Sequence, residues 1–236
     1  MKKILMQNQK VINIFNSVKN YYLMGPYTTT NNCVMPLYVD GRAVFSHPQC
    51  LKGIAQEMIK FIQKEKLKFD FIVGGATAGI PLAVTIGLLM NKPVGYVRKQ
   101  PKGGGTNRVV EGDFKQGSTA LLIDDALGHG AGKTAFLNNI RKSGFKVSWL
   151  LVAGSRGYKN QEYFKWFKTA KVNFASFADL SGIVNDAGNK KLISQQAAQL
   201  LTWYLNDASG WHKDKEKWQY FLAYKKTKQH QSKYGI

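Results

Sequence analysis

The sequence predicts an α/β fold in which helices flank a mainly parallel central sheet. Two observations carry the prediction: short apolar runs of strand length recur along the chain, and segments of helical length separate them. Strands that are apolar along their whole length are typical of parallel sheets, because helices cover both faces. With 236 residues, 44% of them hydrophobic, the chain suffices for one substantial domain with its own core.

Five strands and four helices make up this alternation. The expected strands span Phe69–Val73, Val94–Arg98, Thr119–Ile123, Val147–Ala153 and Val172–Phe177. The expected helices span His47–Lys66, Gly79–Asn91, Gly132–Ser143 and Asn160–Thr169. Gly144 is placed to end the third helix, since glycine readily adopts the left-handed conformation that follows a helix C-terminus.

The two ends of the chain fall outside the alternation. The first 15 residues have a basic start and interrupted apolar residues, which predicts an ordinary N-terminal helix and no leader peptide. After about Asn206 the composition shifts toward Lys, Gln, Trp and Tyr, which predicts a last amphipathic helix and a frayed tail. We therefore expect a main domain over 1–206, with a small hood from 1–45 and part of the C-terminal region. A basic, aromatic-containing helical extension would occupy 207–236.

Charge and cysteine content limit the function classes. Lysine and arginine outnumber aspartate and glutamate by 34 to 14, a net charge of +20. Such an excess indicates an anionic partner, either charged small substrates or nucleic acid, or else lysines that serve solubility. Cys33 and Cys50 form no paired metal-binding motif and no disulfide framework, which fits a cytoplasmic protein. No apolar stretch approaches the ~20 residues needed to cross a bilayer, so no membrane partner is expected.

The most informative stretch is the one from Thr119 to Lys133. An apolar strand leads into Asp124 and Asp125, then into a small-residue turn and a helix. Ligands of open α/β sheets bind at the carboxyl ends of the strands, so these carboxylates should face the crevice. Glycines in the turn let backbone N–H groups approach an anion, and the helix N-terminus favours a phosphate. The combination suits a phosphorylated ribose. A P-loop is disfavoured, because the first glycine that it requires would fall at Leu127.

Two further stretches add anion-binding features. Phe71–Ala83 is another strand, glycine-rich turn and helix, with a second backbone nest at Gly75–Gly79. The segment Tyr96–Gly117 contains Pro101 and three consecutive glycines, and we expect it to be a mobile excursion. Loops of this length inside a compact domain are more often functional than idle. Its four cations are Arg98, Lys99, Lys102 and Arg108.

In this order, the three stretches resemble orotate phosphoribosyltransferases. The resemblance runs from roughly Tyr38 to about Trp203 and includes the arginine-lysine loop and the Asp-Asp turn. It also includes Ser155-Arg156, where the family carries an arginine that holds the orotate base. The segment 177–194, a helix followed by "KLIS" opening another helix, looks like the C-terminal region of bacterial members. The resemblance implies the type I phosphoribosyltransferase fold.

What the resemblance implies about activity is specific. Members transfer phosphoribosyl from magnesium-bound phosphoribosyl pyrophosphate to orotate, giving orotidine monophosphate and diphosphate in pyrimidine biosynthesis. Catalysis would rest on positioning and on stabilising the departing charge. Mg²⁺ would come with the substrate, so no protein metal ligand is assigned. A homodimer is expected, because the family's mobile loop reaches into the neighbouring subunit's site.

The site residues follow by position in the family's motifs. The catalytic set would be Asp124 and Asp125, which bind the ribose hydroxyls, and Arg98, Lys99 and Lys102, which neutralise the diphosphate. The remaining residues would bind the diphosphate (Gly75, Ala76, Thr77, Ala78 and Gly79), the 5′-phosphate (Ala126, Leu127, Gly128, His129, Gly130, Ala131, Gly132 and Lys133) and the base (Tyr38 and Arg156).

Four departures from the family's pattern concern the base and the loop. Family members usually carry threonine where this chain has Gly128 and histidine where it has Gly104. Their N-terminal lysine-serine-glycine segment is replaced by Thr28–Cys33, and of the aromatic pair near the base only Tyr38 is kept. Two alternatives therefore stay open: transfer to a different base, and a phosphoribosyl-pyrophosphate-sensing regulator that binds nucleic acid.

Overall fold

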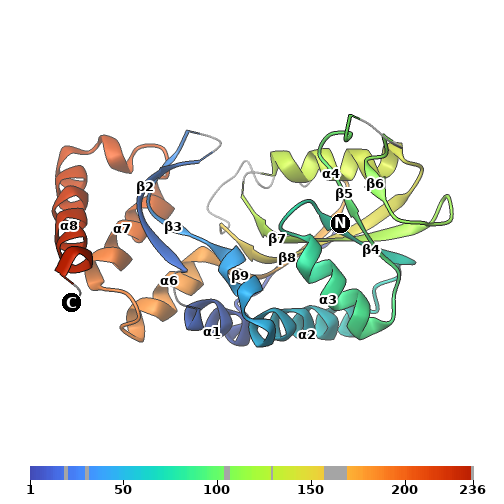
Figure 1. Cartoon of the computed structure of the whole chain (residues 1–236), viewed down its shortest axis with the longest axis horizontal. Coiled ribbons are helices and arrows are strands. Elements are labelled where there is room, and N and C mark those ends of the chain that lie inside the picture. The colour runs from blue at the N-terminus through green and yellow to red at the C-terminus, as the bar shows by residue number, and fades with distance from the viewer. Residues whose placement is uncertain (19–20, 30–31, 104–106, 129, 157–168, 235–236) are drawn as a thin grey trace.

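The structure, a computed structural model, describes residues 1–18, 21–29, 32–103, 107–128, 130–156 and 169–234 (Figure 1). Among these residues, one sheet has the strand order β1-β9-β8-β7-β4-β5-β6. Every neighbouring pair in it is parallel except β5 and β6. The predicted α/β fold with a mainly parallel sheet is confirmed. The strands are β1 (Lys3–Leu5), β4 (Phe71–Gly75), β5 (Val94–Val97), β6 (Val110–Glu111), β7 (Thr119–Leu127), β8 (Lys146–Ser155) and β9 (Asn173–Asp179).

Helices cover both faces of this sheet (Figure 1). On one face lie α1 (Gln9–Ser17), α2 (Pro48–Lys64) and α3 (Ile80–Met90), and on the other lies α4 (Ala131–Lys142). α2 begins at a proline, whose fixed φ suits the first helical position. α4 ends before Gly144, whose φ of +83° is the left-handed conformation predicted for it.

β7 shows why the sheet needs helices on both sides. Its Leu121 and Ile123 belong to the core beneath α1, α2 and α3, whereas Ala120 and Leu122 belong to the core beneath α4. All four side chains are essentially inaccessible to solvent. Because alternate residues point to opposite faces, a continuous apolar run is buried only when both faces are covered.

A second unit, here called the hood, packs beside the carboxyl end of the sheet (Figure 1). It consists of the antiparallel pair β2 (Tyr22–Thr28) and β3 (Val34–Val39) and the helices α6 (Leu180–Asn189), α7 (Gln195–Asn206) and α8 (Lys215–Tyr234). Its core includes Trp211, whose indole Nε1 donates a 2.6 Å hydrogen bond to the carbonyl oxygen of Val34. Ser194 caps α7, as the "KLIS" motif predicts. A domain boundary near residue 206 stays a prediction.

The expectation of a helix from the first residues is wrong for the first part of that segment. Lys3–Leu5 form β1, which pairs in parallel with β9, and Met6 and Asn8 extend the ladder with backbone hydrogen bonds. α1 begins only at Gln9, where the Asn8 side chain accepts hydrogen bonds from the next backbone N–H groups. The long-range pairing with β9 overrides the local pattern.

Other expected segments differ in extent. The excursion Tyr96–Gly117 is partly ordered structure, since β6 pairs with β5 and Phe114 stacks on Phe71 at 3.8 Å between ring centroids. The helix expected over Asn160–Thr169 lies, except for Thr169, outside the described residues. No helix within the described ranges is both long enough and apolar enough to span a membrane.

Candidate functional site

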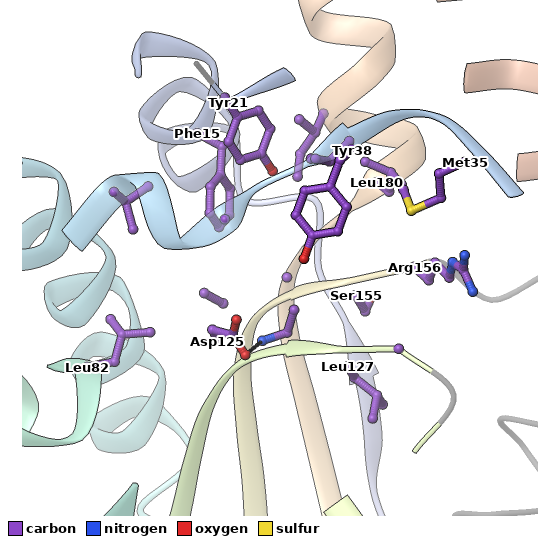
Figure 2. A pocket seen from close by; sticks show the side chains of 18 of the residues that line it. Phe15, Tyr21, Met35, Tyr38, Leu82, Asp125, Leu127, Ser155, Arg156 and Leu180 are labelled. Atoms are coloured by element: carbon purple, nitrogen blue, oxygen red, sulfur yellow. Dashed lines mark hydrogen bonds between the residues drawn. The ribbon is translucent and has the colours of Figure 1, made fainter. Parts of the chain in front are cut away.

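A cavity of about 250 Å³ lies between the carboxyl ends of β7 and β8 and the strand β3 of the hood (Figure 2). Most of its lining is apolar, from residues such as Phe15, Val44 and Leu180. In Figure 2 the hydroxyl of Tyr38 points from β3 toward the strand ends, where Asp125 lies. A largely apolar cavity with a few polar groups is the usual form of a small-molecule site, and it lies where open α/β sheets bind their ligands.

Asp124 and Asp125 lie within β7 and not after it. The strand was expected to end at Ile123, but its pairing with β8 continues to the register pair Leu127 and Ser155. Alternation along the strand buries Asp124, which is 2% exposed, and leaves Asp125 half-buried at the cavity. The two carboxylates therefore have different surroundings.

Asp124 is held by two contacts. Its Oδ1 accepts a 2.9 Å hydrogen bond from the backbone N–H of Asp125, and its Oδ2 pairs with the ammonium of Lys133. Burial, together with the negative charge of Asp125, raises the pKa of Asp124 to about 7, although the Lys133 ammonium and the hydrogen bonds to the carboxylate oppose the rise. The carboxyl of Asp124 thus changes its charge near neutral pH.

The nest Gly75–Gly79 lies against Asp124. A Cβ on Gly75 would stand 2.8 Å from Oδ2 of Asp124 and 2.6 Å from Cε2 of Phe136. A Cβ on Gly79 would stand 2.5 Å from the carbonyl oxygen of Ile123. Only glycine fits at these two positions, and this lets the backbone of the nest approach the acidic pair closely.

The turn after β7 leads directly into α4. Gly130 is the N-cap residue at a φ of +87°, and no described side chain caps the helix start. A Cβ on Gly132 would lie 3.4 Å from Nζ of Lys99, so this lysine reaches the first turn of α4. Gly128 is exposed with open space around its Cα, whereas His129 lies outside the described residues. An uncapped helix N-terminus beside an ammonium is suited to bind a phosphate.

The three loop cations that were expected to neutralise the diphosphate, Arg98, Lys99 and Lys102, lie in different places. Nζ of Lys99 lies 5.9 Å from the centroid of the Phe136 ring, the same distance as Nζ of Lys133. Arg98 lies at the edge of the sheet, where its Nε is 3.3 Å from Oε1 of Glu111, and Lys102 is exposed. The structure thus brings Lys99 to the first turn of α4, and none of Arg98, Lys99 and Lys102 lines the cavity.

Arg156 and Tyr38, the two residues expected to bind the base, both line the cavity. The Arg156 guanidinium lies 4.7 Å from the centroid of the Tyr204 ring, and its backbone N–H donates to the carbonyl oxygen of Leu127 at 3.2 Å. Tyr204, which is fully buried in α7, orients the arginine by a cation–π contact. Sequence reasoning missed both Tyr204 and Phe136, because each reads as an ordinary apolar position of an amphipathic helix.

Magnesium would enter this site bound to phosphate oxygens of a ligand. The described residues contain no group of three or more His, Cys, Asp or Glu side chains that could hold a metal. Mg²⁺ typically keeps several waters and binds through substrate phosphates together with few protein carboxylates. Backbone N–H groups of a nest can take such phosphates, and the entry of the ion together with the substrate stays a prediction.

Comparisons with known proteins point to one family. No protein-family model matches the sequence. The chain is 30% identical to an orotate phosphoribosyltransferase of Rhizobium johnstonii over 188 residues, 79% of this chain and 81% of the relative. It is 34% identical to one of Pyrobaculum aerophilum over 141 residues, 60% of this chain and 72% of the relative.

Solved structures agree on the fold. The orotate phosphoribosyltransferase of Aeropyrum pernix superposes with a TM-score of 0.64 at 22% identity, over 75% of this chain and 99% of that one. The UMP synthase of Leishmania donovani gives a TM-score of 0.72 at 22% identity, over 83% of this chain and 41% of that one. These similarities confirm the expected type I phosphoribosyltransferase fold.

Proposed function

The chain belongs to the orotate phosphoribosyltransferase family, and on this premise we propose that it transfers the phosphoribosyl group of phosphoribosyl pyrophosphate to orotate. The products would be orotidine monophosphate and diphosphate, in pyrimidine nucleotide synthesis. One observation carries the proposal most directly: two glycine-rich anion nests and the acidic pair meet beside a single apolar cavity.

The acidic pair would hold the sugar. Asp125 faces the cavity, and Asp124 lies behind it at the nest. Ionised carboxylates accept hydrogen bonds from the two ribose hydroxyls and fix the ring. Positive charge that develops at the anomeric carbon lies close to both carboxylates, so they also stabilise the transition state.

The two nests would divide the phosphates between them. The backbone N–H groups of Ala76 and Gly79 already donate to the carbonyl oxygens of Val97 and Gly75, so those of Thr77 and Ala78 would meet the departing diphosphate. Lys99, whose Nζ lies 5.9 Å from the centroid of the Phe136 ring beside Gly75, would add positive charge. The uncapped start of α4, with Gly130 as its N-cap, receives the 5′-phosphate. This division would place the anomeric carbon between the acidic pair and the cavity. Magnesium, when bound through the diphosphate, would supply positive charge to the leaving group.

The cavity would hold the base. Orotate is a planar ring with a carboxylate, and the fork of the Arg156 guanidinium matches such a group with two parallel hydrogen bonds. The apolar lining excludes water from the ring nitrogen that attacks the anomeric carbon, and the Tyr38 ring closes the cavity from the hood.

The working unit would be a homodimer. α3 exposes Val84 (41%), Leu88 (78%) and Leu89 (46%) on one face. Exposed apolar side chains gathered on one helix are typical of an interface. In the resembled family the basic loop serves the neighbouring subunit's site, which agrees with the exposure of Lys102 away from the cavity of its own subunit.

A panel of free bases tests the assignment. The purified protein, with phosphoribosyl pyrophosphate and Mg²⁺, would be incubated with orotate, uracil, adenine, guanine or nicotinate, and nucleotide products separated by chromatography. We expect orotidine monophosphate as the main product. A larger yield of nucleotide from another base would identify that base as the substrate in place of orotate. No product from folded protein would refute phosphoribosyl transfer to these bases.

A further inference from the structure

Lys133 occupies a position that helix stability does not explain. It lies in the first turn of α4, which contains no acidic residue, and its side chain is 14% exposed. A cation at a helix N-terminus meets the positive end of the helix dipole, which is unfavourable. Residues that break such a local rule often serve function.

The partner of Lys133 is the carboxylate that the proposed chemistry needs. Asp124, with a side chain 3% exposed, uses Oδ1 for the backbone N–H of Asp125 and Oδ2 for the Lys133 ammonium. A buried carboxylate requires such compensation. While the pair is closed, however, the ammonium occupies the oxygen that could accept a hydrogen bond from a ribose hydroxyl.

Positive groups surround the same point. The nest reaches Oδ2 of Asp124, since a Cβ on Gly75 would stand 2.8 Å from this oxygen. Lys99 and Lys133 approach the Phe136 ring at equal distance, and the uncapped helix start adds its dipole. An arriving phosphate would therefore compete with Asp124 for the Lys133 ammonium, and the long flexible stem of lysine allows the ammonium to move.

We propose that Lys133 exchanges partners on binding: it neutralises Asp124 in the substrate-free protein and bonds to phosphate oxygens of the substrate in the complex. This inference rests on the proposed function. Asp124 becomes available to a ribose hydroxyl only after an anion has drawn Lys133 away. The exchange makes Lys133 a specificity residue that selects phosphorylated pentoses over unphosphorylated ribosides.

A double-mutant cycle on phosphate binding tests the exchange. The affinity of inorganic phosphate, a probe for the 5′-phosphate position at the start of α4, would be measured by calorimetry for the wild type, Asp124→Asn, Lys133→Met and the double variant. We expect Asp124→Asn to tighten binding by roughly 3- to 10-fold, because Lys133 no longer has to leave a carboxylate, and Lys133→Met to weaken it by roughly 10-fold. In the Lys133→Met background the gain from Asp124→Asn should shrink to less than about twofold.

The other outcomes contradict the exchange. An equal gain in both backgrounds would mean that Asp124 acts only through its charge, and an unchanged affinity of Lys133→Met would mean that Lys133 does not meet the phosphate. Lys142→Met, an exposed lysine in the last turn of α4, is the matched control and should leave the affinity unchanged. If Lys133→Met alone does not fold, Asp124→Asn and the double variant still compare the affinity with and without Lys133, since neither contains an unpaired Asp124 carboxylate. Equal affinities of these two variants would mean that Lys133 does not meet the phosphate and would overturn the exchange.

A second measurement addresses selectivity and separates this inference from the base assignment. Ribose 5-phosphate should bind far more tightly than ribose to the wild type, and the ratio of the two affinities should fall by at least about 10-fold in Lys133→Met. A ratio equal to that of the wild type would overturn the exchange. Neither measurement uses orotate. If orotate is not turned over but the double-mutant cycle gives the expected coupling, only the assignment of orotate as the base is refuted. If orotate is turned over but the coupling is missing, only the exchange is refuted.

Discussion

The side-chain amide of Asn139 donates a 2.7 Å hydrogen bond to the backbone carbonyl oxygen of Arg98. The same Nδ2 donates to the carbonyl oxygen of Lys99 at 3.1 Å. Asn139 lies on α4, so these two bonds join the start of the basic loop to the helix that follows the phosphate turn. The backbone of Lys99, which we propose to meet the diphosphate, is thereby tied to the helix whose N-terminus we propose to receive the 5′-phosphate.

Removing this connection should weaken use of the phosphorylated substrate. Asn139→Ala eliminates both hydrogen bonds, each worth about 1 kcal/mol, so we expect kcat/KM for phosphoribosyl pyrophosphate to fall by up to roughly 30-fold. KM for orotate should change little. Steady-state kinetics with each substrate varied in turn measures the two effects. Asn138→Ala, the exposed neighbour, is the control, and an equal loss for both substrates would contradict the account.

The raised pKa of Asp124 predicts the shape of the pH profile. The ionised carboxylate is the form that accepts hydroxyl hydrogens, so kcat/KM for phosphoribosyl pyrophosphate should rise with pH through about 7 and then level off. The Lys133 ammonium lowers the pKa of Asp124, so Lys133→Met should move the midpoint of the profile to higher pH. The negative charge of Asp125, which raises the same pKa, remains in this variant. A profile that is flat through neutral pH would contradict the role of Asp124.

Arg156 should govern orotate and not the sugar. Hydrogen bonds to a charged group are worth about 1.5–3 kcal/mol, so Arg156→Ala should raise KM for orotate by roughly 10- to 150-fold. Arg156→Lys keeps the charge but loses the planar fork, and it should recover only part of the loss. Tyr204→Leu removes the ring beside the guanidinium and should act in the same direction, more weakly. A matching rise in KM for phosphoribosyl pyrophosphate would contradict this assignment.

The exposed face of α3 should carry the dimer. Leu88 is 78% exposed, so Leu88→Glu should leave the fold of the subunit intact while it places a charge in the interface. Light scattering after gel filtration should give a dimer for the wild type and a monomer for the variant. Leu192→Glu, at a residue 54% exposed in the hood region, should remain dimeric. A wild-type monomer, or a dimeric Leu88→Glu, would exclude α3 as the interface.

Sequence patterns predict the central sheet well, for a physical reason. Strands buried on both faces must be apolar throughout, and the glycines that follow β4 and β7 stand where we propose that backbone N–H groups approach an anion. Both signals are local. The predicted strand ends are less accurate. β7 was expected to end before the acidic pair but continues through it, because β8 still pairs with it there.

The hood was not predicted in detail, and its composition explains why. β2 contains Gly25 and Pro26, and β3 contains Pro36, residues that normally argue against a strand. They are tolerated in this two-stranded sheet, where the register shifts between Met24 and Tyr27. Contacts between distant residues, such as Arg156 with Tyr204, depend on the tertiary fold and leave no periodic signal.

The central claim, that this site transfers phosphoribosyl to orotate, is tested most directly by one assay. Loss of orotate absorbance is followed with phosphoribosyl pyrophosphate and Mg²⁺, for the wild type and for Asp125→Asn. The account predicts steady turnover by the wild type and a loss of roughly 100-fold or more in the variant, because Asp125 faces the cavity and would bear the sugar contact. No orotate consumption by folded wild-type protein, or equal rates for the two proteins, would contradict it.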